Sequence, residues 1–360
     1  MIVKDEGHIV SRAIRSALPL TDCWLIVDTG STDNTCEIIR RELSGKQGRL
    51  LRRDWKGFAE SRNDALRAAR EMAGYVLFLD ADDFLVGAAR QSRQELSLSP
   101  LWNCWAYDGW VRHNRVCAVK SEIQTRWVGE RHEYLECDEN AQIETPVLSS
   151  LSIRYMHEGA RSREVQTLDH DSVSLDAMIE SSAVNSPQRA RAFFYRARTA
   201  HAQNHMEEAI SYYEHRAAIV VGDEEERWFA SFEACRLSES HDSAPDLVLS
   251  RMAKISLERP SRAEPLMEMA RLLRCAGALD HALELAHHCV NMAIPKDGIF
   301  VDLSCHFWRA WDEICTIHLL SGRWADAWEP GRRALSFPGV PKRDRERILN
   351  NLKVCRSRRA

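Results

Sequence analysis

The first part of the chain alternates short apolar runs with amphipathic stretches. Cys23 to Val27 and Tyr75 to Leu79 are apolar runs of strand length, whereas Asn34 to Leu43 and Ala59 to Ala73 have a helical period. This alternation is typical of βαβ units and predicts a parallel sheet covered by helices. A weaker run, Arg49 to Arg53, predicts an edge strand.

Beyond Leu101 the helical period disappears, and aromatic and β-branched clusters replace it. These clusters lie at Trp102 to Trp110, Thr125 to Val128 and Val147 to Met156. Residues of these types are enriched in strands. We therefore expect a mixed sheet that completes the first domain.

The chain after Ser162 has a helical pattern to its end. Segments near Ala209, Ala282 and Ala327 each place a turn about five residues before the alanine, and Ala244 fits this pattern less well. Helical hairpins of the tetratricopeptide repeat (TPR) type recur at about 34 residues and need a small residue where the two helices cross. We expect an α/β domain over residues 1–160 and an all-α, TPR-like domain of about four stacked hairpins over residues 161–360.

Composition and charge exclude several classes of protein. Apolar residues make up 44% and charged residues 28%, which excludes disorder for most of the chain. The net charge of −4 is shared between both halves, so neither half indicates a dedicated nucleic-acid clamp. Eleven cysteines without a C-x-x-C pair predict small core residues in a reducing compartment. Because no apolar run approaches the ~20 residues of a membrane span and no signal pattern opens the chain, we expect a cytoplasmic protein.

Three carboxylates follow the apolar run that ends at Leu79, namely Asp80, Asp82 and Asp83. Ligands of open α/β sheets bind at the carboxyl ends of strands, and clustered carboxylates there suit a hard divalent cation with its phosphates. A solvated acidic turn would explain an isolated pair of this kind equally well.

Two further segments strengthen the functional interpretation. Val27 to Thr35 is a second strand end followed by a turn rich in glycine and hydroxyl groups, in which Thr32 or Asp33 is placed to cap the next helix. Phe58 to Leu66 places Arg62 near a helix start, where a guanidinium can grip a pyrophosphate. A surface salt bridge is the alternative for Arg62.

Taken together, four segments resemble, in order and spacing, the family-two glycosyltransferases of GT-A fold. They are Met1 to Glu6, Val27 to Thr35, Arg62-Asn63 and Asp80 to Asp82. The resemblance continues through Trp127 to Leu135 and His157 to Ser162 into the helical repeats. It suggests relatives among bacterial and viral family-two enzymes with a TPR-like C-terminal half, a layout also similar to peptide S-glycosyltransferases. The fold it implies is a Rossmann-like GT-A domain followed by the TPR-like domain.

The resemblance implies roles in donor binding for five matching residues. Asp28 would contact the uracil or ribose of a nucleotide sugar, with a UDP-sugar as the expected donor. Arg62 would contact the nucleotide or diphosphate and Asp80 the ribose. Lys4 and Thr29 would belong to the same cofactor pocket.

The resemblance also implies a metal site. Asp82 would hold Mn²⁺ or Mg²⁺ against the diphosphate, and His157 is the candidate for the second protein ligand. Departure of a nucleoside diphosphate builds negative charge, which a metal offsets as a Lewis acid. A structural histidine at a strand end is the alternative for His157.

Family-two enzymes invert the anomeric centre, so a carboxylate on the acceptor side must take the proton from the attacking hydroxyl or thiol. Glu133 and Glu130 are the candidates, with His132 as a third. We prefer Glu133 because the stretch from His132 to Leu135 matches the family. A surface salt bridge would explain either glutamate.

Two features depart from the family's pattern. The Met-Ile-Val-Lys stretch begins at Met1, whereas relatives have several residues before it, so we expect a short first strand or a native start upstream. Asp5 stands where the family usually has asparagine, which adds a negative charge near the donor pocket.

The expected function is a metal-dependent inverting glycosyltransferase that uses a nucleotide sugar. A protein or peptide is the first choice of acceptor, because TPR-like solenoids have concave surfaces suited to peptides. Transfer to a saccharide, or to a modified base in nucleic acid, is an alternative that the basic tail from Lys342 to Arg359 mildly supports. A solvated final helix is the simpler explanation of that tail. A non-catalytic, nucleotide-sugar-binding TPR scaffold is the second alternative, and nucleotidyl transfer ranks last.

Overall fold

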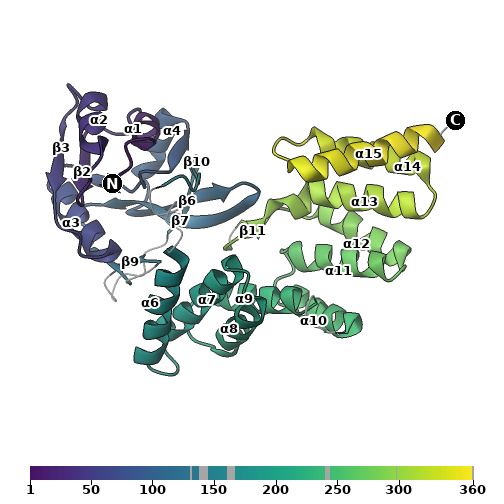
Figure 1. Cartoon of the computed structure of the whole chain (residues 1–360). Coiled ribbons are helices and arrows are strands. Elements are labelled where there is room, and N and C mark those ends of the chain that lie inside the picture. Colours follow the sequence, from purple (N-terminus) through teal and green to yellow (C-terminus); the bar gives the residue numbers. More distant parts are fainter. Residues whose placement is uncertain (130–131, 138–144, 160–166, 240–243, 297, 359–360) are drawn as a thin grey trace. The chain divides into compact units, whose positions relative to one another are not determined.

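A computed structural model describes residues 1–129, 132–137, 145–159, 167–239, 244–296 and 298–358 (Figure 1). The chain divides into two compact units. Unit 1 comprises Met1–Asp108 and His113–Ala177, and unit 2 comprises Gly109–Arg112 and Met178–Ala360. The division falls inside helix α6 (Thr167–Ser181), whereas the expected boundary after residue 160 borders residues outside the described ranges.

The first sheet of unit 1 is the expected parallel one. β1 pairs with β2 and β2 with β3, so that Val3 lies opposite Asp28 and Asp28 opposite Arg52. Apolar residues of α1 and α2 pack on this sheet and bury Val3 and Ile26, which is why these strands are apolar runs. The elements are β1 (Ile2–Val3), α1 (Val10–Ala17), β2 (Trp24–Asp28), α2 (Thr35–Glu42), β3 (Gly48–Arg52) and α3 (Phe58–Arg70).

The second sheet of unit 1 is mixed, as the aromatic and β-branched clusters predicted. Its strand order is β7-β6-β10-β5, with β4 antiparallel to β7, β6 parallel to β10 and β5 antiparallel to β10. A further antiparallel pair joins β8 to β9. The elements are β4 (Tyr75–Leu77), β5 (Phe84–Gly87), α4 (Ala89–Leu96), β6 (Leu101–Asp108), β7 (Val111–Lys120), β8 (Thr125–Val128), β9 (Tyr134–Cys137) and β10 (Val147–Arg154).

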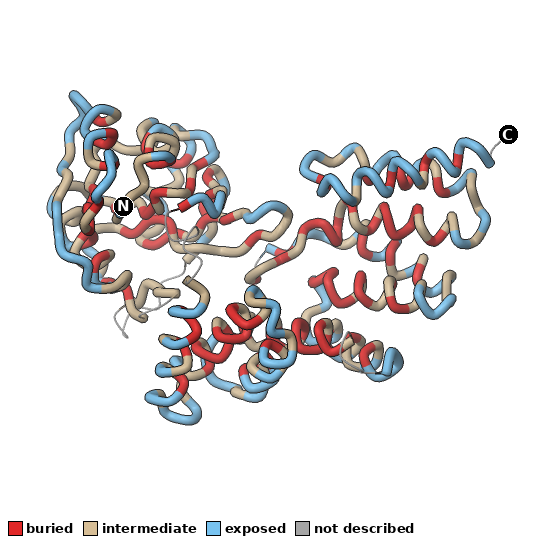
Figure 2. Tube along the Cα trace, in the orientation of Figure 1, coloured by how far each residue is buried: buried red, intermediate tan, exposed pale blue. Residues whose placement is uncertain are grey.

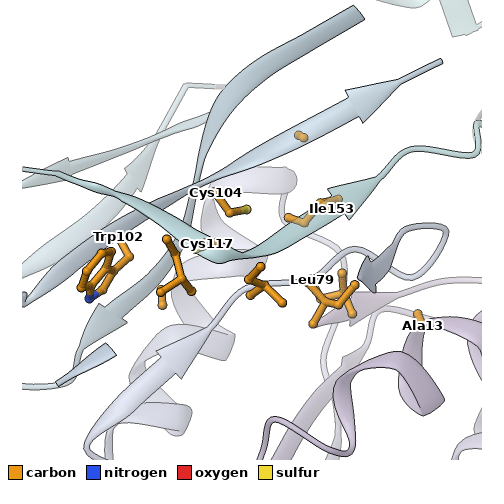
Figure 3. Close-up of a cluster of buried hydrophobic side chains, with 11 residues drawn as sticks. Ala13, Leu79, Trp102, Cys104, Cys117 and Ile153 are labelled. Atoms are coloured by element: carbon orange, nitrogen blue, oxygen red, sulfur yellow. The ribbon is translucent and has the colours of Figure 1, made fainter. Parts of the chain in front are cut away.

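One apolar cluster joins the second sheet to the elements before it (Figure 3). Trp102 and Cys104 of β6, Cys117 of β7 and Ile153 of β10 pack with Ala13 of α1. Leu79, just after β4, lies in the same cluster and is 4% exposed. This packing fixes the end of β4 immediately before the three aspartates.

Unit 2 is a series of helical hairpins in which each helix packs on the next (Figure 1). In the described part of unit 2, four hairpins precede the final helix α15, which agrees with the expectation. They are α7–α8, α9–α10, α11–α12 and α13–α14. Among the described helices, none is both long and apolar enough to cross a membrane. The elements are α7 (Pro187–Ala202), α8 (Met206–Ala218), α9 (Glu224–Ser238), α10 (Pro245–Glu258), α11 (Glu264–Cys275), α12 (Leu279–Asn291), β11 (Val301–Asp302), a 3-10 turn (Leu303–His306), α13 (Trp308–Leu320), α14 (Trp324–Ser336) and α15 (Lys342–Arg358).

Small residues mark the helix crossings of unit 2. Ala209, Ala282 and Ala327 are each the fourth residue of α8, α12 and α14, and all three have no exposed surface. The assignment of Ala244 was wrong, because Ala244 precedes α10 as its exposed N-cap. Val248, the fourth residue of α10, is buried in that position instead. Figure 2 shows the buried residues along the sides of the helices that face their neighbours.

Candidate functional site

Arg62 of α3 brings distant segments of unit 1 together. Its Nη2 lies 2.7 Å from Asp80 Oδ1, and its Nε lies 2.5 Å from Glu133 Oε1. Its guanidinium also lies over the ring of Trp127, 5.2 Å from the ring centroid. Burial opposes the charge of Arg62, but the Asp80 and Glu133 carboxylates raise its pKa above the ordinary value. Arg62 and the preferred base are therefore in direct contact.

The neighbouring Asn63 holds the strand that leads to Glu133. Its Nδ2 donates to the carbonyl oxygen of Trp127 at 2.9 Å, and the Trp127 N–H donates to Asn63 Oδ1 at 2.7 Å. The side-chain amide thus pairs with β8 as a strand backbone would, which fixes the start of the turn before Glu133. Glu130, the other candidate base, lies outside the described residues.

A loop of four residues, Asp80–Asp83, follows β4 and is called the acidic loop below. Arg115 of β7 lies 2.5 Å from Asp80 Oδ2 and 3.0 Å from Asp83 Oδ2. Burial opposes ionisation of Asp80, but Arg115 and Arg62 together hold its pKa well below the usual range. Among the described residues, Asp83 pairs with Arg115 and with no second arginine. Burial and the charges of Asp80 and Asp82 raise the pKa of Asp83 to about 8.

Asp82 differs from the two aspartates beside it. Within the described residues, its carboxylate forms no ion pair with an arginine or lysine. Burial and the charge of Asp80 raise its pKa. A Cβ on Gly159 would lie 2.7 Å from Asp82 Oδ2, so a side chain there would displace this carboxylate. Asp82 is the carboxylate of the acidic loop that is available to a cation.

Arg12 of α1 fixes the backbone of the acidic loop. Its Nη2 donates to the carbonyl oxygen of Asp82 at 2.9 Å, and its Nη1 lies 2.7 Å from Glu158 Oε2. His157, next to Glu158, has a φ of 53°, a conformation uncommon for residues other than glycine. Arg12 therefore connects the acidic loop to the segment that carries His157.

His157 is paired with Asp108, the last residue of β6. Its Nε2 lies 2.8 Å from Asp108 Oδ2, and the imidazole is one of the groups that lower the pKa of Asp82. Metal-binding histidines commonly use one ring nitrogen for the metal and the other for a carboxylate. With Nε2 in this contact, Nδ1 is the other ring nitrogen of His157.

A complete protein cage for a metal is absent from the described part of the chain, where no three His, Cys, Asp or Glu side chains form such a group. Two protein ligands nevertheless suffice for Mg²⁺ or Mn²⁺ when substrate phosphates and water complete the coordination. A carboxylate oxygen and an imidazole nitrogen are suitable donors for Mn²⁺. Asp82 and His157 fit a cation that binds together with a diphosphate.

The turn after β2 is held by its own hydrogen bonds. Asp28 is 1% exposed, and its Oδ1 accepts from the Ser31 N–H at 3.0 Å. The backbone N–H and the hydroxyl of Thr29 both donate to the carbonyl oxygen of Val3, at 2.9 and 3.1 Å. Lys4 is exposed at the end of β1. Asp28 and Thr29 therefore shape this turn, and a role of either in nucleotide binding stays a prediction.

Asp5 links the turn after β1 to the turn before α2. Its Oδ1 accepts from the backbone N–H groups of Thr32 at 2.7 Å and Asp33 at 3.3 Å. Asp33 in turn accepts from the Thr35 N–H at 2.9 Å, which satisfies the first N–H of α2. The N-cap residue itself is Asn34, so the assignment of the cap to Thr32 or Asp33 was wrong. The extra negative charge of Asp5 is thus met by backbone N–H groups.

A small pocket lies between β1, β2, β4 and α3. Its lining includes Met1, Leu25, Leu66 and Tyr75, and Arg62 reaches it among mainly apolar side chains. β1 has only two residues, and the amino group of Met1 donates to the carbonyl oxygen of Leu25 at 3.2 Å. A nucleoside diphosphate needs polar and cationic partners, whereas this pocket offers mainly apolar ones.

The comparison with protein families finds a match in the N-terminal region. Residues 1–86 match the family model described as glycosyl transferase family 2. We call residues 1–86 the family-two segment, after the family that they resemble. The family-two segment contains Arg62, Asp80 and Asp82, whereas Glu133 and His157 lie beyond it.

Individual proteins resemble different parts of the chain. A TPR repeat-containing protein of Synechococcus elongatus is 38% identical over 87 residues, which cover 24% of this chain and 20% of that protein. The chain thus matches about a fifth of the length of this curated relative. Among solved structures, MamA is similar over 51% of this chain and 95% of its own, at 14% identity and a TM-score of 0.38. YrrB, described as a TPR protein with an unusual peptide-binding site, is similar over 52% of this chain and 85% of its own, at 14% identity and a TM-score of 0.37.

Sequence reasoning missed Arg115, Arg12 and Asp108, which contact the predicted site residues. Arg12 lies on α1, whose apolar positions Val10, Ala13 and Ile14 have a helical period. That period was a usable signal for α1. Arg115 and Asp108 depend on strand register, for which a single sequence gives no comparable signal.

Proposed function

We propose that unit 1 transfers a sugar from a nucleotide sugar to an acceptor nucleophile, with inversion at the anomeric carbon. The observation that supports this most strongly is the meeting of Asp80 and Glu133 on the guanidinium of Arg62. This junction lies next to the end of β4, where ligands of α/β sheets bind. The family-two segment supports glycosyl transfer as the class of reaction.

In this proposal Asp82 and His157 would hold Mn²⁺ or Mg²⁺. The raised pKa of Asp82 indicates a carboxylate whose ionised form lacks sufficient stabilisation from the chain, which a cation would supply. The bound ion would offset the negative charge of the departing nucleoside diphosphate. Asp28 and Asp80 are the proposed contacts of the nucleoside, with UDP as the first choice.

Arg62 is the proposed partner of the donor diphosphate. A diphosphate competes with Glu133 and Asp80 for the guanidinium, because all three are anions that bind the same planar group. Loss of the Arg62 contact leaves Glu133 as a free carboxylate that can take the proton from an acceptor hydroxyl or thiol. Donor binding would thus prepare the base.

The proposed acceptor is a protein or peptide recognised by unit 2. Arg236 and Glu239 at the end of α9 line a hollow together with Glu268 and Arg271 of α11. Side chains of both charges in an open hollow suit the backbone and charged side chains of an extended peptide. A saccharide acceptor would instead favour exposed aromatic platforms.

A thermal-shift panel of UDP, GDP and CMP, each with and without Mn²⁺, tests the donor site. A ligand that binds only the folded protein raises the melting temperature. We expect a rise with one nucleotide that depends on Mn²⁺. No shift with any of the three would contradict the donor site.

A further inference from the structure

The acidic loop is held at both of its ends by one side chain. Arg115 Nη2 contacts Asp80 and Arg115 Nη1 contacts Asp83, at 2.5 and 3.0 Å. The Asp83 N–H also donates to the carbonyl oxygen of Asp80 at 3.3 Å, which closes the loop on itself. Asp82 lies between the two contacts and takes no part in them. Arg115 therefore holds both ends of the loop that carries the Asp82 carboxylate, for which the described residues provide no arginine or lysine ion pair.

The sheet places Arg115 opposite the loop. β4 and β7 are antiparallel, with Leu77 opposite Ala118, and the Phe78 N–H donates to the carbonyl oxygen of Cys117 at 2.8 Å. The same register, continued beyond β4, brings Asp80 opposite Arg115. Arg115 is thus anchored in a strand, and its side chain is only 15% exposed.

A third contact orients the guanidinium of Arg115. Its Nη1 donates to Tyr155 Oη at 3.4 Å, and its central carbon lies 5.8 Å from the centroid of the Tyr155 ring. Tyr155 Oη also lies 3.1 Å from His113 Nε2. Tyr155, which follows β10 and contacts His113 of β7, therefore orients the guanidinium of Arg115.

We propose that Arg115 is a positioning residue that fixes the acidic loop so that the Asp82 carboxylate is ready for a cation. The proposal rests on the proposed function of Asp82. A planar guanidinium bridges two carboxylates at fixed geometry, whereas a lysine ammonium is a compact charge on a flexible stem. Lysine at this position keeps the charge but cannot hold Asp80 and Asp83 in the same way.

The competing explanation is that Arg115 only balances the charge of the aspartates. The two explanations differ in their prediction for Arg115→Lys, because this variant leaves the net charge unchanged. Charge balance alone predicts an unchanged affinity for Mn²⁺. Positioning predicts an affinity lowered by about tenfold, the size typical of lost support around a metal site. Removal of the charge, as in Arg115→Gln, is avoided because it removes the Arg115 partner of the buried Asp83 and leaves Asp80 with Arg62 alone.

The test is an Mn²⁺ titration followed by electron paramagnetic resonance, with UDP present, on wild type and Arg115→Lys. Arg126→Lys is the matched control, since Arg126 forms an exposed fork with Glu136 on β8 and β9. We expect the dissociation constant of Mn²⁺ to rise about tenfold in Arg115→Lys and to stay unchanged in Arg126→Lys. Wild-type affinity in Arg115→Lys would overturn the proposal.

Hydrogen exchange separates this proposal from the proposed function. Arg115→Lys is expected to speed amide exchange in a peptide covering residues 78–85, with no metal or nucleotide present, because the loop loses its bridge. Unchanged exchange in that peptide would overturn the positioning role. A wild-type protein that binds no Mn²⁺ would contradict the proposed function, and exchange would then decide the role of Arg115 by itself.

Discussion

Both units bury arginine–carboxylate pairs, but the pairs serve different ends. In unit 2, Glu268 of α11 is held by Arg271 at 2.9 Å and by Arg309 of α13 at 2.8 Å. In unit 1, Arg62 and Arg115 hold Asp80 in a similar way, and Asp82 beside it forms no such pair among the described residues. A fully paired buried carboxylate is typical of structural networks, whereas an unpaired one with a raised pKa is a candidate for function.

The pairs of unit 2 connect the first helices of successive hairpins. Glu226 of α9 pairs with Arg191 of α7, and Glu313 of α13 lies 2.5 Å from Arg274 of α11. Each pair joins one hairpin to the next, which stabilises the stack of repeats. The arginines of unit 1 instead converge on one loop and one glutamate, so their arrangement defines a site.

We expect the largest effect on activity from a substitution of Asp82. Asp82→Asn should lower metal-dependent donor hydrolysis on the order of 100-fold or more, because it removes the proposed cation ligand. The melting temperature should stay near that of wild type, because no described ion pair is lost. Release of nucleoside diphosphate at saturating Mn²⁺ measures the rate, and an unchanged rate would refute the assignment.

A substitution of Glu133 tests whether this partner of Arg62 also acts as the catalytic base. Glu133→Gln should lower transfer to the acceptor by about 100-fold or more, since it removes the proton acceptor. Nucleotide binding in a thermal-shift assay should persist. Glu136→Gln, at the exposed pair with Arg126, is the matched control and should leave transfer unchanged. A wild-type transfer rate in Glu133→Gln would move the base to Glu130 or another residue.

A variant of unit 2 should affect stability and leave donor hydrolysis intact, because hydrolysis of the donor needs no acceptor. Glu268→Gln removes the charge that holds Arg271 and Arg309 and should lower the free energy of unfolding by about 2 kcal/mol. Urea unfolding followed by circular dichroism measures this loss. Donor hydrolysis per folded molecule should equal that of wild type, and its loss in a stably folded variant would contradict the contrast between the units.

The smallest expected effect is a pH dependence of the stability that Glu268 contributes through Arg271 and Arg309. Burial raises the pKa of Glu268, but the charges of Arg309 and Arg271 lower it by more than burial raises it. The pKa of Glu268 therefore lies below the ordinary 4.5. The pair therefore stabilises the fold above about pH 4.5 and loses this contribution as the pH falls through the folded-state pKa. The difference in unfolding free energy between wild type and Glu268→Gln should shrink as the pH falls below 4.5. A difference that stays constant down to pH 3 would contradict the pairing.

Much of the fold was predictable from hydrophobic periodicity. β2, α2 and β3 lie within a residue or so of the stretches predicted from Cys23 to Arg53, because each has a regular period and polar turns at its ends. β7 was harder to recognise, since Arg112, His113 and Arg115 interrupt its apolar pattern. Ala244 shows the limit of repeat detection, because one alanine does not fix the register that buries Val248.

The candidate site was harder to predict from the sequence than the fold. The aspartates after Leu79 follow directly from the end of an apolar strand, and the structure places them there. The contact between Arg62 and Glu133 was not predicted, because the two residues lie on elements far apart in the sequence. The contacts of Arg115 and Asp108 join residues far apart in the sequence, so no local sequence pattern predicts them.

The most direct test of the central claim is Mn²⁺ binding in the presence of UDP, compared between wild type, Asp82→Asn and Glu268→Gln. If the unpaired carboxylate of unit 1 is the cation ligand, Asp82→Asn will lose Mn²⁺ binding while Glu268→Gln keeps the affinity of wild type. Mn²⁺ binding by Asp82→Asn at wild-type affinity would contradict the claim.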